Sequence, residues 1–521
     1  MLARARRDPA RRRSFLSNAP SDGLLGAGLL LVAVIVAVAT APPLLLTGFF
    51  HDDSFFYIKT AQHISEGAGS TFDEVNRTNG YHPLYMLLLV GLALLVPLVD
   101  EAGIRLVIVL DTVLLAGALP FLDRLLSALA IRRSVRLPAM MGVVVGIGFY
   151  DFGVEGRLLL LIAVVYLWAI TRASGTSGWM VPALGVLLCL VRIDAILFVG
   201  IVVVAVHLAG QRRRERPLLS AAARQLAPAL AVVAGYMAYN QIVFEHPTTI
   251  SSWLKIGWRN GFDPPLLSTT GLKLRYLGSI AGALLVIPVI ARKWIQASSA
   301  RQRLGAGITS GLACHSMAYL GVLTLFLRGG LNTWYFALPL LMVMTCLAYV
   351  VEHEMLRRLD RISVAGLARR SLLAGAWVVL LAALGIGVAN KSDNRWHDQH
   401  ALGRWIGQHL PPDARIFQVD SSGGTAYFGR RSVINGDGLI NGWEYQRYLR
   451  DGRLRDYLAE TGVRWLIWDE YHGEPEIRIP VPLWSEPPLE ITFAEEPILA
   501  ARFGRMALLE ITPRIVRVSR R

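Results

Sequence analysis

The chain has 521 residues, of which 54% are hydrophobic and only 17% are charged, against roughly 25% charged residues in an ordinary soluble protein. The apolar residues gather in runs of about 20, the length of a membrane-spanning helix, which excludes an ordinary soluble globular protein. The net charge of +15 does not indicate nucleic-acid binding, because the basic residues cluster in short loops between apolar runs, where anionic lipids supply the counter-charge.

The first elements are a basic N-terminus and a long apolar run. Residues 1–22 carry six arginines and precede the run Leu24–Phe50. This run is longer than the apolar core of a signal peptide, about 7–15 residues, so we expect a transmembrane helix with residues 1–22 in the cytoplasm. Residues 51–81 then form the first extracytoplasmic loop, which opens with two adjacent acids, Asp52 and Asp53. Carboxylates next to a bilayer are costly and usually functional.

Eleven further apolar segments follow, at 82–99, 104–128, 138–151, 156–172, 179–191, 193–209, 226–244, 276–291, 305–327, 333–351 and 371–390. The positive-inside rule places four basic loops in the cytoplasm: Ile131–Arg136, Gln211–Arg216, Arg292–Arg303 and Arg357–Arg370. One conflict arises, because two crossings between residues 81 and 130 would put Ile131–Arg136 outside. Either one of those two segments is re-entrant or interfacial, or this loop breaks the rule. We predict about eleven transmembrane helices in a module spanning residues 23–390.

Residues 391–521, the tail domain, differ in character, with short apolar runs and frequent turn signals. The pattern predicts helices at Ala401–Leu410 and Tyr445–Thr461, strands at Arg415–Val419, Ser432–Asn435 and Val463–Trp468, and later strands ending near Ile511. Alternation of strands and helices indicates a small α/β domain, which the span count places outside the cytoplasm. A glycine-rich turn, Ser421–Gly424, could cradle a phosphate, although it has no G-x-G-x-x-G pattern.

The conspicuous polar and aromatic residues of the membrane module fall on the extracytoplasmic side. The candidate site residues are Asp52, Asp53, Asn79, His82, Glu155, Arg192, Asp194, Lys255, Arg259, Trp334 and Tyr335. The cytoplasmic loops carry plain arginines instead. This asymmetry predicts an extracytoplasmic active site or binding cavity.

Each candidate also has a purely structural interpretation. Asp52 and Asp53 fit an acidic helix N-terminus as well as a general base or a metal site, and two neighbouring acids raise one another's pKa. Asn79 and His82 could bind a polar ligand or simply precede a helix that begins at a proline. Glu155 could be a helix cap.

The remaining candidates leave similar alternatives open. Arg192 and Asp194 could pair with each other at a hairpin tip. Lys255 and Arg259 lie in an outer loop of a protein whose positive charge is mostly inside. They fit an anion site, such as one for a lipid phosphate, as well as ordinary interfacial snorkelling. The neighbours Trp334 and Tyr335 fit an aromatic belt as well as a sugar-stacking platform.

The stretch HDDSFFYIKTAQHISEGAGSTFDEVNRTNGYHPLY at 51–85 closely resembles the GT-C superfamily of membrane glycosyltransferases. It resembles bacterial members that are relatives of the protein mannosyltransferases and of the actinobacterial arabinofuranosyltransferases. The stretches GVEG at 153–156, RID at 192–194, PTTISSWLK at 247–255, WY at 334–335 and YFGRRSVINGDGLIN at 427–441 also resemble these proteins. The resemblance covers nearly the whole chain.

The resemblance implies an inverting glycosyltransferase of a bacterial cytoplasmic membrane. Its donor would be a polyprenyl-phosphate-linked hexose or pentose, and its acceptor a glycan, lipid or protein of the cell envelope on the outer face. It implies that Asp52 is the catalytic base with Asp53 beside it as second acid or metal ligand, while the spacing alone leaves open which of the two is the base. Glu155 would hold the acceptor or orient the base. The resemblance further implies donor-phosphate ligands among Arg192, Lys255 and Arg259, and substrate contacts from Asn79, His82, Asp194, Trp334 and Tyr335. Some members use a divalent metal, so Mg²⁺ or Mn²⁺ held by Asp52 and Asp53 stays open.

Two other functions compete with this one. A transporter needs polar residues near the midplane and matching halves with interrupted helices, whereas here no internal repeat stands out and the polar groups lie at one face. A receptor could bind carbohydrate through its tail domain and use the membrane part only as an anchor. An anchor would need neither about eleven spans nor the acids of the first loop.

Overall fold

We describe the fold from a computed structural model. It describes residues 22–148, 151–172, 178–210, 218–256, 270–327, 331–356, 394–469, 479–481 and 489–520. Several predicted features lie outside these residues, namely the segment 1–21, the loops Gln211–Arg216 and Arg357–Arg370, the span at 371–390 and Arg259.

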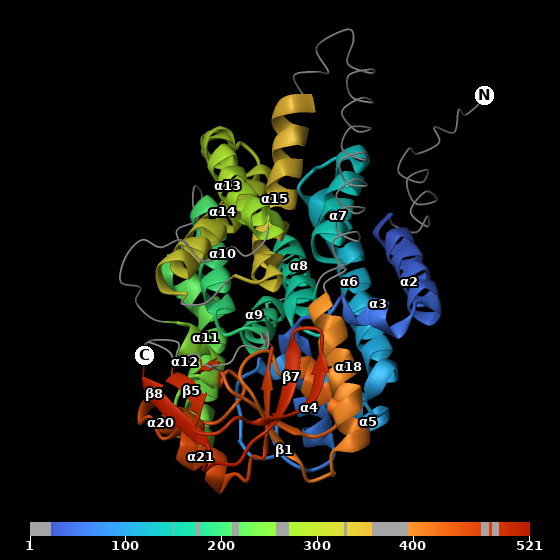
Figure 1. The fold of residues 1–521 in the computed structure, drawn as a ribbon. Helices are drawn as coiled ribbons and strands as arrows, with labels where there is room; N and C mark the ends of the chain where they lie inside the picture. Colours follow the sequence, from blue (N-terminus) through green and yellow to red (C-terminus); the bar gives the residue numbers. More distant parts are fainter. Residues whose placement is uncertain are drawn as a thin grey trace, which may run out of the picture.

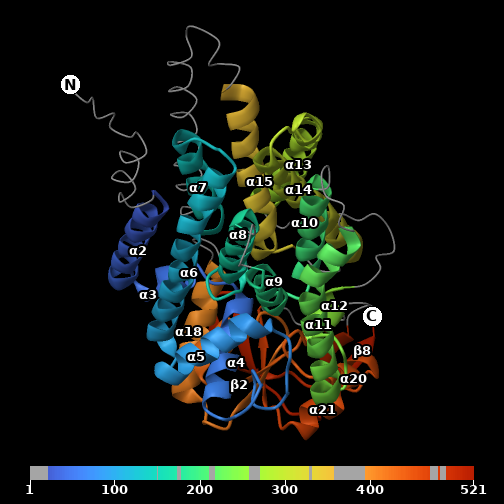
Figure 2. The same ribbon diagram turned by 180° about the vertical axis from the view of Figure 1, so that it is seen from behind.

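The molecule has a helical region and a tail domain built around β-sheets, which covers one end of the helices (Figures 1 and 2). The helices of the first region are α2 Asp22–Thr40, α3 Pro43–Thr47, α4 Asp52–Ser65, α5 Pro83–Leu95, α6 Asp100–Ala128, α7 Arg133–Gly148, α8 Gly156–Arg172, α9 Met180–Val191, α10 Ala195–Gly210, α11 Leu218–Phe244, α12 Ile250–Lys255, α13 Thr270–Gln296, α14 Ala300–Phe326, η2 Thr333–Phe336, α15 Ala337–Val350 and η3 Val351–Leu356.

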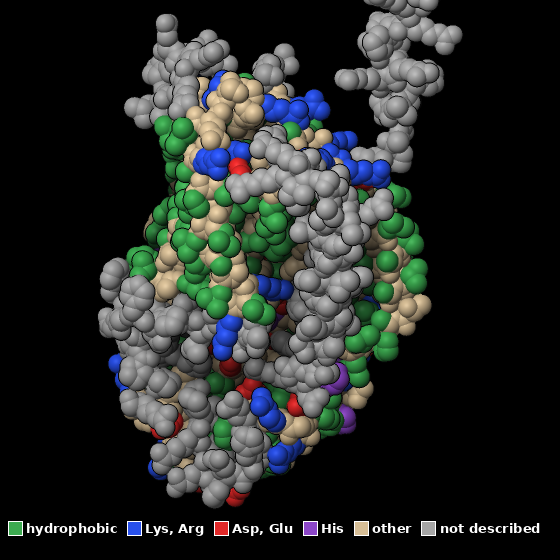
Figure 3. Space-filling view, turned by 90° about the horizontal axis from the view of Figure 1, so that it is seen from above, with side chains coloured by type: hydrophobic (Ala, Val, Ile, Leu, Met, Phe, Trp, Pro, Cys, Tyr) green, Lys and Arg blue, Asp and Glu red, His purple; other side chains and the backbone are tan. Residues whose placement is uncertain are grey.

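Six of the described helical segments are long and apolar enough to cross a membrane: Asp22–Thr40, Asp100–Ala128, Ala222–Phe244, Lys273–Gln296, Ala300–Phe326 and Thr333–Leu356. Shorter apolar helices lie among them, and Figure 3 shows a broad hydrophobic area bounded on one side by Lys and Arg side chains. The chain is therefore a multi-spanning α-helical membrane protein, as predicted. The number of about eleven spans stays a prediction.

Helix α5 resolves the conflict over the Ile131–Arg136 loop. Its two ends lie beside α4, because the backbone N–H of His82 donates to Tyr57 Oη (2.9 Å) and that of Leu98 donates to Gln62 Oε1 (2.8 Å). Thirteen helical residues reach only about 20 Å, short of the roughly 30 Å apolar core of a bilayer. Segment 82–99 thus returns to the tail-domain end, and α6 alone carries the chain to the opposite end.

The tail domain contains the predicted α/β unit. Its elements are α18 Asn394–His409, β1 Arg415–Gln418, α19 Gly423–Gly429, β2 Ser432–Asn435, α20 Trp443–Arg450, α21 Leu454–Glu460, β3 Trp465–Trp468, β4 Ile479–Val481, β5 Leu489–Phe493, β6 Ile498–Phe503, β7 Met506–Glu510 and β8 Val516–Arg520. One sheet has the order β2-β1-β3-β7-β6, with β1 parallel to β2 and β3 and the other pairs antiparallel; a second has the order β4-β5-β8.

Two predictions in the tail domain were wrong in detail. The single helix expected at Tyr445–Thr461 is two helices, α20 and α21, because Gly452 between them adopts a left-handed backbone (φ +69°), which glycine tolerates at little cost. The strands also continue past Ile511, since β8 pairs with β5 along its length.

The tail domain packs directly against the first loop. Lys59 Nζ donates to the carbonyl of Arg431 (2.6 Å), and the Asn76 amide bonds to Tyr457 Oη (2.8 Å). At the start of α6, Asp100 pairs with Arg430. Residues more than 300 positions apart in sequence therefore build one structural unit at this end of the molecule.

Candidate active site

A cavity of about 360 Å³ opens between the first loop, the helix ends and the tail domain. Its lining includes most of the predicted site residues: Asp53, His82, Glu155, Arg192, Asp194, Lys255, Trp334 and Tyr335. The structure thus brings together residues that are spread over almost 300 positions of the sequence. Asp52 and Asn79 do not line this cavity.

Asp53 is the carboxylate of the acidic pair that faces the cavity. Its Oδ2 lies 3.5 Å from Lys255 Nζ, and its Oδ1 lies 3.5 Å from His51 Nδ1. Burial alone would raise the pKa of Asp53, but the charge of Lys255 and the hydrogen bond and charge of His51 outweigh it and lower that pKa below its usual value. Asp53 therefore carries a negative charge in the unliganded cavity.

Asp52 points the other way, into the tail domain. Its Oδ1 accepts a hydrogen bond from the backbone N–H of Gly424 (3.2 Å), and the residue is only 4% exposed. A side chain on Gly423 would lie 2.4 Å from the Asp52 carbonyl oxygen. The glycine-rich turn predicted as a phosphate cradle thus receives a carboxylate of the protein itself.

Helix geometry explains why the two acids diverge. Successive residues of an α-helix point about 100° apart, and Asp52 and Asp53 are the first two residues of α4. Their surroundings also differ electrostatically. Burial raises the pKa of Asp52 to about 7, although the backbone N–H groups of Gly423 and Gly424 oppose this rise. Of the two acids only Asp53 lines the cavity, and the catalytic role of each stays a prediction.

A second charged cluster also lines the cavity. Glu155 Oε1 accepts from Arg192 Nη1 (2.6 Å), and Glu155 Oε2 accepts from Tyr57 Oη (3.2 Å). Arg192 also bonds to both carboxylate oxygens of Asp194, at 3.0 and 2.7 Å. His82 Nε2 lies 3.5 Å from Glu155 Oε1. Arg192 and Asp194 do pair at the hairpin tip, so this guanidinium is already held by two carboxylates.

A buried network inside the helical region holds Glu155 in place. Asp111 on α6 accepts hydrogen bonds from the backbone N–H of Gly153 (2.7 Å), from Tyr85 Oη (2.9 Å) and from Arg157 Nη1 (3.3 Å). Gly153 has φ +83°, a conformation that favours glycine. The turn before α8 is thereby tied to α6, and Glu155 at the end of this turn lines the cavity.

Asn79 is a scaffold residue that positions Lys255. Its Nδ2 donates to Asn240 Oδ1 (3.1 Å) and to the carbonyl of Thr248 (3.3 Å), while its Oδ1 accepts from the N–H of Ile250 (2.9 Å). Ile250 is the first residue of α12 and Lys255 the last. The side chain therefore joins the first loop to the short helix that presents the lysine.

Aromatic and apolar groups close the rest of the cavity. The rings of Trp334 and Tyr335 stack with centroids 6.0 Å apart, and the Arg192 guanidinium lies 5.1 Å from the Tyr335 centroid. One wall is apolar and comes mainly from the end of α14: Val322, Leu323, Phe326 and Leu327. The tail domain contributes Leu439 and Ile440.

Several residues at the cavity were not predicted from the sequence. His51 and Tyr57 flank Asp53 in sequence and contact the charged groups, yet a histidine before a helix and a buried tyrosine are usually structural. Their position inside the 51–85 stretch was the only available signal. Leu439 and Ile440 carried no signal at all, because apolar residues in an α/β domain normally belong to its core.

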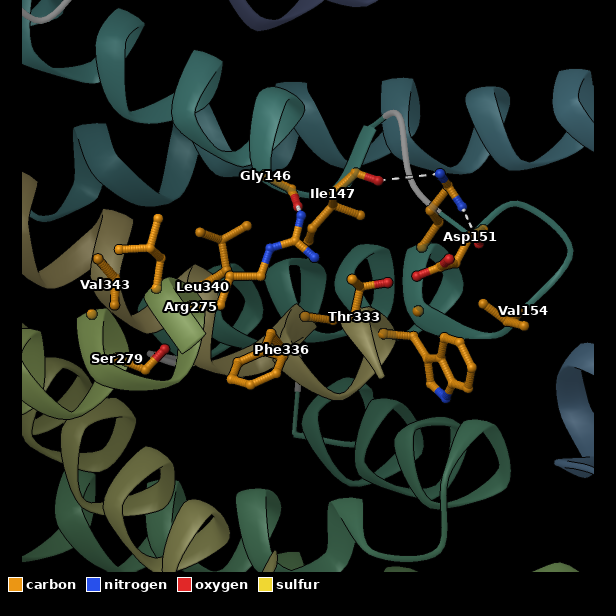
Figure 4. A pocket seen from close by; sticks show the side chains of 16 residues that line it. Gly146, Ile147, Asp151, Val154, Arg275, Ser279, Thr333, Phe336, Leu340 and Val343 are labelled. Atoms are coloured by element: carbon orange, nitrogen blue, oxygen red, sulfur yellow. Dashed lines mark hydrogen bonds between the residues drawn. The ribbon is translucent and has the colours of Figure 1, made fainter. Parts of the chain in front are cut away.

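Behind Trp334 lies a smaller cavity of about 170 Å³ (Figure 4). Val154 and Trp334 line both cavities. Arg275 reaches from α13 toward the carbonyl of Gly146 (3.2 Å), and Leu340 and Val343 form an apolar end. Trp334 and Val154 therefore lie between the two cavities.

The described residues do not offer a ready metal site. Within them, no group of three or more His, Cys, Asp or Glu side chains is arranged to hold a metal ion. Asp52 and Asp53 bind different partners and do not converge on a common point. The pair therefore does not fit the Mg²⁺ or Mn²⁺ site that the resemblance left open, and we derive no step through a metal.

Comparison with known proteins gives one match to the tail domain and others to nearly the whole chain. The model of a domain of unknown function, DUF8728, matches residues 389–509. No curated protein matches the sequence. Two crystal structures of ArnT from Cupriavidus metallidurans, in the apo state and bound to undecaprenyl phosphate, are similar with TM-scores of 0.56 and 0.51, each at 14% identity over 93% of this chain and 98% of theirs.

The Archaeoglobus fulgidus oligosaccharyltransferase, tethered to an acceptor peptide, is also similar: 12% identity over 84% of this chain and 69% of that one, with a TM-score of 0.48. The likeness to ArnT extends over both the membrane module and the tail. The chain therefore shares the fold of the two ArnT structures.

Proposed function

We propose that the protein is an inverting glycosyltransferase that moves a sugar from a polyprenyl-phosphate donor to a cell-envelope acceptor. The observation that carries the proposal is one cavity in which Asp53 and Lys255 form an ion pair beside an apolar wall. A donor of this class needs a cation for its phosphate and an apolar surface for its chain. The shared fold with ArnT, which binds undecaprenyl phosphate, supports the same class.

Lys255 is the proposed ligand of the donor phosphate. Its side chain is about one-sixth exposed, and its partner Asp53 is a single carboxylate, whereas Arg192 is held by two. When Lys255 turns to the phosphate, Asp53 loses the charge that lowers its pKa and becomes a stronger base. Donor binding and activation of the base are thus coupled. Arg259, the third predicted phosphate ligand, lies outside the described residues.

Asp53 is the proposed general base, because a base must first lie within reach of the proton it removes. The acceptor hydroxyl gives its proton to Asp53 while its oxygen bonds to the anomeric carbon. The bond from that carbon to the phosphate oxygen breaks, and the electron pair leaves with the lipid phosphate, whose charge Lys255 stabilises. A single displacement of this kind inverts the anomeric centre.

The second cluster is proposed to bind substrate hydroxyl groups. Glu155, His82 and Asp194 present acceptors and donors to the cavity, and Trp334 and Tyr335 offer flat faces on which a sugar ring can stack. The polyprenyl chain runs along Leu323 and its apolar neighbours. All of these groups lie at the tail-domain end of the helices, which speaks against a transporter with a midplane site. We place this end at the outer face of a bacterial cytoplasmic membrane.

The decisive experiment uses purified protein in lipid nanodiscs with radiolabelled polyprenyl-phosphate pentoses and hexoses and a cell-envelope acceptor extract. We expect Asp53→Asn to lower turnover by about 10²–10⁴-fold, the usual contribution of a general base. Asp413→Asn, an exposed position on the tail domain, should leave turnover unchanged. Turnover in Asp53→Asn within a factor of about three of the wild type would reject the assignment of the base.

A further inference from the structure

A second charged cavity lies at the end of the molecule opposite to the tail domain. It has a volume of about 570 Å³ and is formed by the end of α6, the start of α7, the end of α8 and the start of α14. Its charged and aromatic lining residues are Asp123, Arg124, Arg136, Trp168, Arg172 and Arg301. Cavities of 300–1,000 Å³ are typical of small-ligand sites.

Three arginines of this cavity, Arg124, Arg172 and Arg301, are held by aromatic rings or carbonyl groups, which do not neutralise their charge. The guanidinium groups of Arg124 and Arg172 lie 5.9 and 5.7 Å from the centroid of Trp168, and that of Arg124 lies 5.5 Å from the centroid of Phe121. Arg301 donates to the carbonyls at the end of α6, at 2.7 and 2.8 Å. Stacking on a ring and bonding to carbonyls orient a guanidinium but leave its positive charge in place.

The cavity therefore has an excess of positive charge. Asp123 is the one carboxylate among its described lining residues, and it forms an ion pair with Arg136 (2.8 Å). Within the described part of the chain, Arg124, Arg172 and Arg301 have no carboxylate partner. Other cations at this end do have one, since Arg132 pairs with Glu352 and Lys293 pairs with Glu354.

We propose that this cavity binds the phosphodiester headgroup of an anionic phospholipid in the cytoplasmic leaflet. Basic pockets between transmembrane helices on the cytoplasmic side suit such headgroups, and aromatic residues such as Trp168 favour the membrane–water boundary. A lipid at this position bridges α6, α8 and α14, which it ties together at the end where no tail domain covers the helices.

The test measures lipid binding to the purified full-length protein in detergent by native mass spectrometry. The probes are phosphatidylglycerol, the zwitterionic phosphatidylcholine and soluble glycerol 3-phosphate. Of these three probes, we expect only phosphatidylglycerol to bind tightly. The variant Arg124→Gln/Arg172→Gln/Arg301→Gln should weaken it on the order of a hundredfold, because each arginine near an anionic headgroup contributes roughly a fivefold factor.

The matched control removes three arginines from the same end but outside the cavity, Arg133→Gln/Arg292→Gln/Arg303→Gln, and should change the affinity less than about threefold. Equal losses in both triple variants overturn the proposal, and so does glycerol 3-phosphate binding as tightly as phosphatidylglycerol. If the triple cavity variant melts at a lower temperature than the wild type without lipid, the single variant Arg172→Gln replaces it in the binding measurement. Its expected loss is roughly fivefold, and an unchanged affinity overturns the proposal.

Discussion

The two neighbouring acids of the first loop show how much one residue of offset changes a carboxylate. Asp53 faces a lysine and a histidine in an open cavity, and Asp52 faces backbone N–H groups of the tail domain. The pKa of Asp53 is lowered and that of Asp52 is raised to about 7. We infer that Asp53 reacts with substrate and that Asp52 anchors the tail domain to the first loop.

Asp52 leads to a prediction about stability and pH. Because its pKa is about 7 in the folded protein and 3.8 in the unfolded chain, the folded state holds a proton that the unfolded chain releases above about pH 4. The contribution of Asp52 to stability is therefore present at low pH and is lost as pH rises from about 4 to about 7. Asp52→Asn, which stays neutral, should flatten this part of the stability profile.

Thermal unfolding of detergent-purified protein between about pH 5 and about pH 8 measures the effect. The drop in melting temperature across this range should be smaller in Asp52→Asn than in the wild type. Asp413→Asn is the control and should keep the wild-type profile. An identical pH dependence in Asp52→Asn and the wild type would show that Asp52 does not take up the proton.

Lys255 leads to a prediction about donor affinity. Lys255→Met keeps most of the side-chain volume and removes the charge that we propose binds the phosphate, so the KM for the donor lipid should rise about 10–100-fold. Lys273→Met removes a charge from an exposed position on α13 and should leave KM unchanged. Steady-state kinetics with varied donor test this, and an unchanged KM in Lys255→Met would exclude the lysine as the phosphate ligand.

At the scale of elements, short segments rather than long helices build the cavity. Helix α4, the six-residue α12 and the 3₁₀ helix η2 present Asp53, Lys255 and Trp334. The transmembrane helices hold these segments in place, for example through the contact of Asp111 with Gly153. The start of α4 has a local signal in its two acids, whereas the positions of α12 and η2 in the cavity depend on contacts with distant segments.

The contact between α4 and α19 leads to a prediction about Gly423. An added Cβ would lie 2.4 Å from the Asp52 carbonyl oxygen, so Gly423→Ala must push α19 away from α4. We expect a loss of about 2–3 kcal/mol, as for overpacking in a core, seen as a lower melting temperature and faster proteolysis of the tail domain. Gly91→Ala, where a Cβ meets nothing within 4 Å, is the control. Equal stability of the two variants would contradict the close contact.

At the scale of the whole molecule, the fold separates two chemically different ends. The tail domain covers the end that carries the candidate active site, and the opposite end carries the arginine-rich second cavity. The route of α6 from Asp100, beside the tail domain, to Ala128, beside Arg301, shows that the loop Ile131–Arg136 belongs to this opposite end. The positive-inside rule then assigns it to the cytoplasm.

Topology can be tested by cysteine labelling in a variant without Cys189, Cys314 and Cys346. A membrane-impermeant maleimide added to intact cells should label Asp413→Cys on the tail domain. It should reach Ser134→Cys, in the loop before α7, only after the membrane is opened. Labelling of Ser134→Cys in intact cells would overturn the orientation and the return of α5 to its starting side.

The amino-acid sequence by itself determined the membrane-spanning architecture, because repeated apolar runs of about 20 residues match the length of a helix that crosses a bilayer. It also determined the α/β tail, whose short strands and turns are local patterns, and the set of polar residues at one end. Only the tertiary structure decided that α5 returns to α4, that Arg192 is occupied by two carboxylates, and that Asp53 rather than Asp52 faces the cavity. The physical reason is that these choices depend on contacts between distant segments, such as Asp52 with Gly424, 372 positions away.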